Sequence, residues 1–132
     1  MPLDLSYDNK SRFEVRASGE VTLKEVEGMI DELLAHPGLT SGPDVLIVAD
    51  EVEQVLSTSE LRVVARKLSP VLDRGLGALA IVTRNPFVSG VARVFAVFAE
   101  SVGAEIAAFR EVDDASKWLA AARSSAQPNQ RT

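Results

Sequence analysis

One short apolar segment constrains the fold of this chain more than any other feature. Residues Val45–Ala49 are five consecutive apolar residues between Asp44 and Asp50, and a Ser-Gly-Pro turn signal precedes them. A short apolar run with such boundaries predicts a strand buried on both faces, which is typical of a parallel sheet covered by helices. A second run of this kind, Gly77–Thr83, follows after a helix-length interval. Together the two runs predict a βαβ unit with a right-handed crossover.

Periodicity and capping signals predict the elements in the first half of the chain. Alternating apolar and polar residues at 3–7 and 12–17 predict a β-hairpin at an edge of the sheet, with one face buried. Capping boxes that begin at Thr22 and Ser57 each precede apolar residues with helical spacing, which predicts two amphipathic helices. The second of these helices contains Pro70, so we expect a kink or an early end there.

The same signals predict the second half. Asn85 with a following proline predicts the start of a third helix, and a strand at 104–109 precedes a helix capped by Asp113. The polar, aperiodic residues 124–132 predict a disordered C-terminal tail. We therefore expect one α/β domain over residues 1–123. Its central mixed, mostly parallel sheet should have about five strands flanked by about four helices.

Composition excludes several classes of function. The 132 residues include 14 basic and 19 acidic side chains, for a formal net charge of −5, and no basic stripe offsets this sign. Nucleic-acid binding is therefore not expected. The absence of cysteine excludes disulfides, cysteine-ligated zinc and thiol chemistry. The N-terminal residues lack the basic region and apolar core expected of a signal peptide, and no apolar stretch approaches the ~18 residues of a membrane span, so we expect a cytoplasmic protein.

No catalytic constellation is visible in the sequence. The single histidine, His36, lacks a nearby nucleophile or carboxylate pair and is better explained as complementing a helix dipole. The acidic residues Asp50, Glu51 and Glu53 lack further ligands at the spacing of a metal site. We therefore expect no enzymatic activity, no metal and no cofactor.

The order of the elements over about residues 3 to 122 resembles the SpoIIAA-like fold. This fold is shared by STAS domains (sulphate transporter and anti-sigma factor antagonist) and by the lipid-binding CRAL-TRIO proteins. The overall pattern is similar to uncharacterised bacterial STAS-like proteins. The resemblance implies a regulatory or protein-interaction role.

The segment Val55–Leu61 resembles a motif of the anti-sigma factor antagonists, Asp-Ser-Ser-Gly-Leu, whose first serine is phosphorylated by a partner kinase. Ser57 stands at the aspartate of that motif, Thr58 at the phosphorylated serine and Ser59 at the second serine. Glu60 replaces the glycine. Its negative charge would repel a phosphate, and its bulk would obstruct a closely docked kinase.

Two short segments are candidate sites, each with a purely structural alternative. Ser57, Thr58 and Ser59 form a candidate phosphoacceptor loop, although Ser57 with the glutamate three residues on is also an ordinary helix cap. Arg84 and Asn85 follow a predicted parallel strand and open a helix, which is where α/β proteins bind anions and other ligands. Asn-Pro is also an ordinary helix start, and Arg84 is then only solvated.

The predicted third helix leaves three alternatives open because it is the most apolar helix of the chain. It could be plain core, or it could form a homodimer interface, since a two-fold interface uses a self-complementary patch. It could also line an apolar pocket, as the lipid-binding relatives suggest. The residues that would form the interface or the pocket are Phe87, Val91, Phe95 and Phe98.

These observations favour a non-enzymatic regulatory or protein-interaction module that resembles STAS domains and forms a homodimer. The alternative is a small protein that binds a lipid or another small apolar ligand in a SpoIIAA-like or CRAL-TRIO-like fold. The sequence does not name the partner, the ligand or the pathway.

Overall fold

The computed structural model describes residues 3–8 and 11–125, and its five strands form one sheet in the order of the sequence. The strands are β1 (Leu3–Tyr7), β2 (Arg12–Glu20), β3 (Asp44–Gln54), β4 (Leu79–Val82) and β5 (Ile106–Phe109). β1 is antiparallel to β2 and outermost, and the three pairings that follow are parallel. The predicted mixed, mostly parallel sheet and the hairpin at its edge are therefore confirmed.

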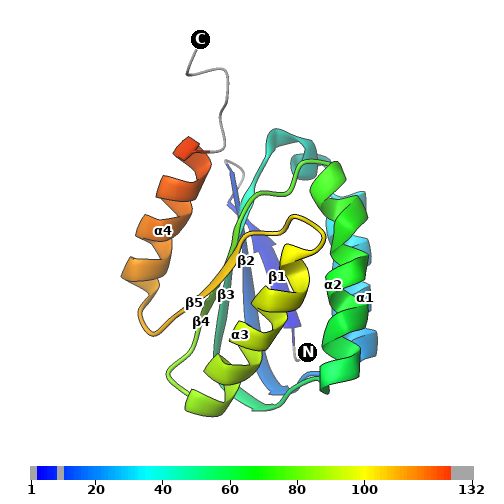
Figure 1. Cartoon of the computed structure of the whole chain (residues 1–132). Helices are drawn as coiled ribbons and strands as arrows, with labels where there is room; N and C mark the ends of the chain where they lie inside the picture. The colour runs from blue at the N-terminus through cyan, green and yellow to red at the C-terminus, as the bar shows by residue number, and fades with distance from the viewer. Residues whose placement is uncertain (1–2, 9–10, 126–132) are drawn as a thin grey trace.

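Four α-helices cover the two faces of this sheet. They are α1 (Leu23–Ala35), α2 (Thr58–Asp73), α3 (Pro86–Glu100) and α4 (Val112–Ser125), and a 3₁₀ helix occupies Pro37–Ser41. Strands β2 to β5 are parallel neighbours in the order of the sequence, so each of the three connections moves one strand further in the same direction across the sheet. Because parallel crossovers are right-handed, α1, α2 and α3 lie on one face. Figure 1 shows these three helices together, with α4 alone on the opposite face.

The predicted central strand is β3, which lies between β2 and β4. Its side chains alternate between the two faces of the sheet: Val45 and Ile47 face α1–α3, whereas Leu46 packs in the cluster under α4. The strand extends to Gln54, beyond its predicted end at Asp50, because a register shift lets its last residues continue to pair with β2.

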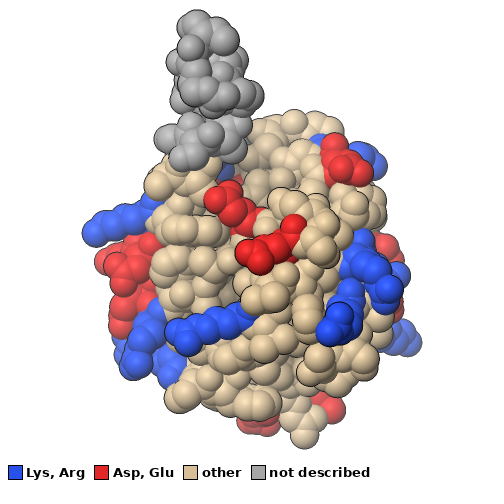
Figure 2. All heavy atoms as spheres, in the orientation of Figure 1, with Lys and Arg blue, Asp and Glu red and all other residues tan. Residues whose placement is uncertain are grey.

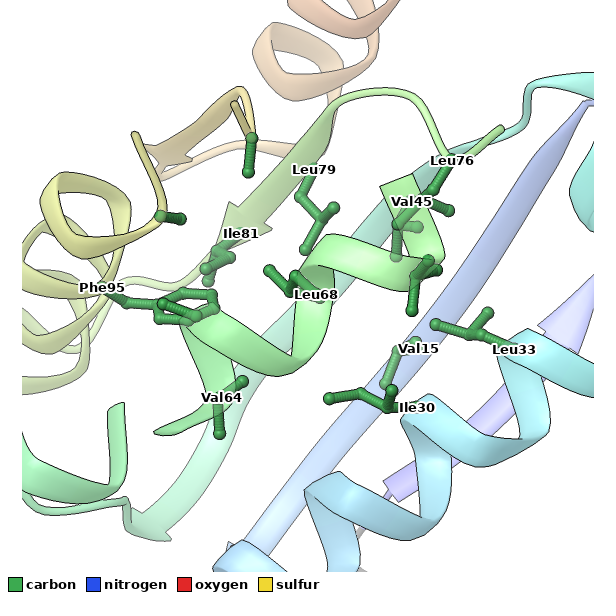
Figure 3. Packing of buried hydrophobic residues seen from close by; sticks show 14 of the residues in the cluster. Val15, Ile30, Leu33, Val45, Val64, Leu68, Leu76, Leu79, Ile81 and Phe95 are labelled. Atoms are coloured by element: carbon green, nitrogen blue, oxygen red, sulfur yellow. The ribbon is translucent and has the colours of Figure 1, made fainter. Parts of the chain in front are cut away.

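The main hydrophobic core lies between the sheet and the three helices on its first face (Figure 3). Leu33 of α1, Leu68 of α2 and Phe95 of α3 all point towards the strands in this view. The smaller core under α4 contains several alanines, and both Ala80 of β4 and Ala115 of α4 have no exposed surface. The two sides of the sheet therefore differ in the size of the side chains that fill them.

Two local predictions about helix ends are wrong in detail. The early end expected at Pro70 is wrong, because α2 continues to Asp73, whereas the kink named as the other outcome stays a prediction. Pro70 is exposed, so the backbone carbonyl that loses its helical partner can be hydrated on that side of the helix. Asp113 does not precede α4 as its cap; the helix begins at Val112, and Asp113 lies in its first turn, where a negative charge complements the helix dipole.

The end of the chain is described only in part. α4 includes Ser124 and Ser125, which the sequence pattern placed in the tail, and the rest of the predicted tail, residues 126–132, lies outside the described residues. Within the ranges 3–8 and 11–125, no helix combines the length and the apolar character that a membrane span requires.

Candidate functional site

The predicted site residues gather where the parallel strands end. At this end of the sheet, which we call the carboxyl edge, β3, β4 and β5 finish and α2, α3 and α4 begin (bottom of Figure 1). Ligands of open α/β sheets commonly bind at such an edge. The polar residues placed here are Asp50, Ser57, Thr58, Ser59, Thr83, Arg84, Asn85 and Glu111.

The candidate phosphoacceptor loop forms the N-terminus of α2. The Ser57 Oγ accepts a hydrogen bond from the Glu60 backbone N–H at 3.3 Å, and the Glu60 carboxylate accepts one from the Ser57 backbone N–H at 2.9 Å. This is the predicted capping box. Ser57, Thr58 and Ser59 are all exposed, and the hydroxyl oxygens of Ser57 and Ser59 lie 3.3 Å apart. The loop is accessible, and Ser57 serves the helix cap.

Arg84 lies between two acidic residues. Its backbone N–H donates to the Asp50 Oδ1 at 2.8 Å, and its guanidinium donates to both carboxylate oxygens of Glu111, at 2.9 and 2.8 Å. The hydrogen bond and the charge of Glu111 raise the pKa of Arg84 above its ordinary value. Arg84, which was predicted to contact an anionic ligand, therefore binds the Glu111 carboxylate of the same chain. Glu111 was not predicted as a site residue, because its only signal in the sequence is an acidic residue following the last strand.

Asn85 caps α3 as predicted from the Asn-Pro pair. Its Oδ1 accepts from the backbone N–H of Phe87 at 2.9 Å and from that of Val88 at 3.4 Å. The hydroxyl of Thr83, which is buried, donates to the Ala49 carbonyl at 3.3 Å and accepts from the Asn85 N–H at 3.1 Å. The turn from β4 into α3 is thus held by side-chain hydrogen bonds, and the donors at this helix N-terminus have partners within the chain.

The four α3 residues named from the sequence separate into different environments. Phe95 is 9% exposed and belongs to the main core, and both Phe95 and Val91 line a cavity between the sheet and the helices. Phe87 is 64% exposed. Phe98 is half-buried, and the Arg62 guanidinium of α2 stacks over its ring at 4.3 Å from the centroid. One helix therefore supplies both the core and an exposed apolar surface.

One exposed side of α3 is apolar, while the exposed charged residues Arg93 and Glu100 lie beside it. Phe87, Val94 and Val97 are three of the four large hydrophobic residues exposed in the described part of the chain, and Gly90 lies between them at helical spacing. We call these four residues the α3 face. Figure 2 shows an uncharged band here, with basic side chains on either side and acidic side chains beyond its upper end. The sequence predicted the apolar helix but not which of its sides is exposed.

The cavity lies inside the main core and has a volume of about 160 Å³. Its lining is entirely apolar and comes from β1, β2, β3, β4 and the three helices on that face. Among its lining residues, Ile47 is only half-buried although it stands in the middle of the central strand. The void above this side chain explains that incomplete burial.

A buried ion cluster lies at the opposite end of the strands, which we call the amino edge. The Asp44 side chain, 3% exposed, accepts from the Arg12 Nε at 2.7 Å and pairs with an Arg123 nitrogen at 2.9 Å. Arg12 also donates to the Ser116 hydroxyl, and Arg123 donates to Ser11. The cluster joins α4 to β2 and β3, and nothing in the sequence pattern predicted it.

The described residues contain no cluster of three or more histidine, aspartate or glutamate side chains able to hold a metal ion. His36 caps the 3₁₀ helix through its Nδ1, which accepts from the Gly38 N–H at 2.9 Å, and its ring packs on Tyr7 and Phe13. His36 lies at the C-terminal end of α1, where the dipole role was predicted, and it also has this capping and packing role.

Solved structures match this chain at low sequence identity, and two of the matches follow. An uncharacterised protein of the DUF3478 family with a SpoIIAA-like fold, from Shewanella loihica PV-4, is 19% identical to this chain with a TM-score of 0.59, over 89% of this chain and 91% of that one. A chain from the Pseudomonas aeruginosa complex of the diguanylate cyclase SiaD with its activator SiaC is 15% identical with a TM-score of 0.45, over 81% of this chain and 90% of the other.

No curated protein matches the sequence. A family model described as SpoIIAA-like matches residues 12–120. This range contains strands β2 to β5 and the four α-helices, except the end of α4. The resemblance drawn from the order of the elements is confirmed: the chain belongs to the SpoIIAA-like family.

Proposed function

We propose that this protein is a non-enzymatic protein-interaction module that forms a homodimer through the α3 face. The observation that supports this proposal is the exposure of large apolar side chains on one helix, with Phe87 64% and Val97 63% exposed. Contiguous exposed apolar surface is uncommon on monomeric proteins and usually marks a site of association. A single helix face is a small interface, so we expect a weak and reversible dimer.

The charges of α3 favour a second copy of the chain as the partner. The only charged residues of the helix, Arg93 and Glu100, have opposite signs and lie two turns apart on one flank of the α3 face. In an antiparallel pair of α3 helices, a two-fold axis near the middle of the helix brings Val94 of one copy against Val97 of the other. The same axis brings each Arg93 within reach of the Glu100 of the second copy, which makes the surface self-complementary.

Sedimentation over a concentration series tests this proposal with two matched variants. We expect the wild-type protein to be a dimer at high concentration and Val97→Asp to be a monomer with unchanged secondary structure, because the new charge would be buried in the dimer alone. Val112→Asp is the control, since Val112 is 44% exposed at the start of α4, away from the α3 face. It should dimerise as the wild type does. A wild-type monomer at all concentrations would overturn the proposal.

A charge exchange tests the pairing itself. Arg93→Glu and Glu100→Arg should each weaken the dimer, because each places like charges opposite one another. The double variant should restore it. If both single variants dimerise like the wild type, the antiparallel arrangement is wrong even if the α3 face is the interface.

A further inference from the structure

We propose that the apolar cavity beneath α1, α2 and α3 is a binding site for a small, neutral, apolar molecule. Protein cores are packed as densely as organic crystals, and voids larger than a water molecule are few. A cavity of about 160 Å³ in the core of a 132-residue chain is therefore an unusual feature. It is separate from the exposed α3 face and from the polar residues of the carboxyl edge.

The lining determines the chemistry of the ligand. Every lining residue is apolar, and no polar surface faces the cavity. Water needs two or more polar partners to remain in such a space, so water is a poor occupant. A carboxylate, phosphate or ammonium group would also lose its hydration there without gaining a partner. The molecule that fits is uncharged and lacks hydrogen-bonding groups at the buried end.

The volume determines the size of the ligand. An apolar cavity of roughly 150 Å³ is known to bind benzene or xenon, whereas pockets for drug-sized ligands have about 300–1,000 Å³. The present cavity, about 160 Å³, matches the first class. It has room for a single ring or a short branched chain but not for the acyl chain of a membrane lipid. Of the two ligand classes considered from the sequence, a lipid or another small apolar molecule, the volume favours the small apolar molecule.

The half-buried part of the lining indicates where a ligand enters. Leu3, Val21, Val55 and Leu56 all line the cavity and are half-buried. Val21 follows the end of β2, Val55 and Leu56 follow the end of β3, and Leu3 pairs with Ala17 near the end of β2. Val26, Met29, Ile47 and Val91 also line the cavity and are half-buried, so the carboxyl edge, next to the exposed Ser57–Ser59 loop, is one of the places where the lining comes near the surface.

Titration with benzene, followed through the methyl resonances of the protein, tests the proposal. We expect saturable shifts at Ile47 and Val91, which line the cavity. Leu46 and Val82 serve as internal references, since they belong to the core on the opposite face of the same sheet. No saturable shift up to the solubility limit of benzene would overturn the proposal. Equal shifts at the two references would do the same, because they would indicate unspecific partitioning.

Two substitutions in the same helix add a matched control. Ala92 lines the cavity, so Ala92→Val fills part of it and should weaken benzene binding about tenfold. Ala96 does not line the cavity, so Ala96→Val should bind benzene as the wild type does. Unchanged binding by Ala92→Val would contradict the site. If Ala92→Val does not fold, Ala17→Val replaces it, since Ala17 lines the cavity from β2.

Discussion

The two ends of the parallel strands use charge in opposite ways. At the amino edge, the Asp44 side chain is 3% exposed and is held by two arginines. At the carboxyl edge, the Arg84 and Glu111 side chains pair while 64% and 54% exposed. The desolvation of a buried charge makes its partners obligatory, whereas an exposed pair exchanges readily with water. The amino edge is therefore built for stability, and the carboxyl edge leaves its groups available.

The apolar packing is not divided between the two edges as the charges are. Leu39 and Phe13, near the amino edge, have no exposed surface, and the rings of Tyr7 and His36 close over Phe13 at centroid distances of 4.8 and 4.9 Å. At the carboxyl edge, Leu56 is only half-buried and borders the cavity. The cavity also reaches Val45 and Leu76 near the amino edge, so its lining spans both ends of the strands.

The largest effect on this comparison is expected from Asp44→Asn. The substitution removes the negative charge from a site with two arginines, and breaking a buried ion pair by losing one partner typically costs about 3–5 kcal/mol. The Arg12 and Arg123 side chains are 26% and 33% exposed and can be partly hydrated, so we expect a loss of about 3 kcal/mol in the free energy of unfolding. Urea unfolding at neutral pH measures this value.

The same substitution at the other edge is the control. Asp50 is exposed and, among the described residues, accepts a hydrogen bond from the Arg84 backbone N–H, which an asparagine oxygen can also accept. Asp50→Asn should therefore change the free energy of unfolding by no more than about 0.5 kcal/mol. Equal losses for the two variants would show that the contrast between the edges is wrong.

An intermediate effect is expected from Ser57→Ala, which removes the cap of α2. Loss of a serine cap typically costs about 1 kcal/mol. Thr58→Ala is the matched control, because Thr58 is exposed at the first helical position and alanine favours the helix. Unfolding midpoints and hydrogen exchange of the Glu60 amide measure the two effects. A loss for Thr58→Ala as large as for Ser57→Ala would show that the loop contributes more to stability than its cap alone.

The features that the sequence predicted correctly depend on residues close together in the chain. Both capping boxes join residues three positions apart, so Thr22 with Glu25 and Ser57 with Glu60 could be recognised directly. The central strand was visible as a continuous apolar run, because a strand with neighbours on both sides and helices on both faces needs no polar side. From these local signals the element order followed, and with it the family.

The features that the sequence did not predict depend on distant partners or on packing. Asp44 looked like the boundary of a strand, and its partner Arg123 lies on the last helix. Phe87 and Phe95 belong to one apolar helix, and only the position of α3 against the sheet decides that Phe95 is buried and Phe87 exposed. The cavity is the space left between many side chains from different elements, so no local sequence pattern predicts it.

The smallest effect is expected from Arg84→Gln. Glu111 raises the pKa of Arg84, so the guanidinium is charged throughout the pH range in which the protein can be studied, and titration of Arg84 cannot alter stability there. The pair is exposed, water can replace either partner, and salt screens what attraction remains. We therefore expect no measurable change in the urea midpoint at low or at high salt, while the Arg84 backbone N–H keeps its bond to Asp50. A urea midpoint that falls as far as in Ser57→Ala would mean that the Arg84–Glu111 ion pair stabilises the carboxyl edge, as the Asp44 ion pairs stabilise the amino edge. It would then be less free to exchange Glu111 for a ligand or a partner.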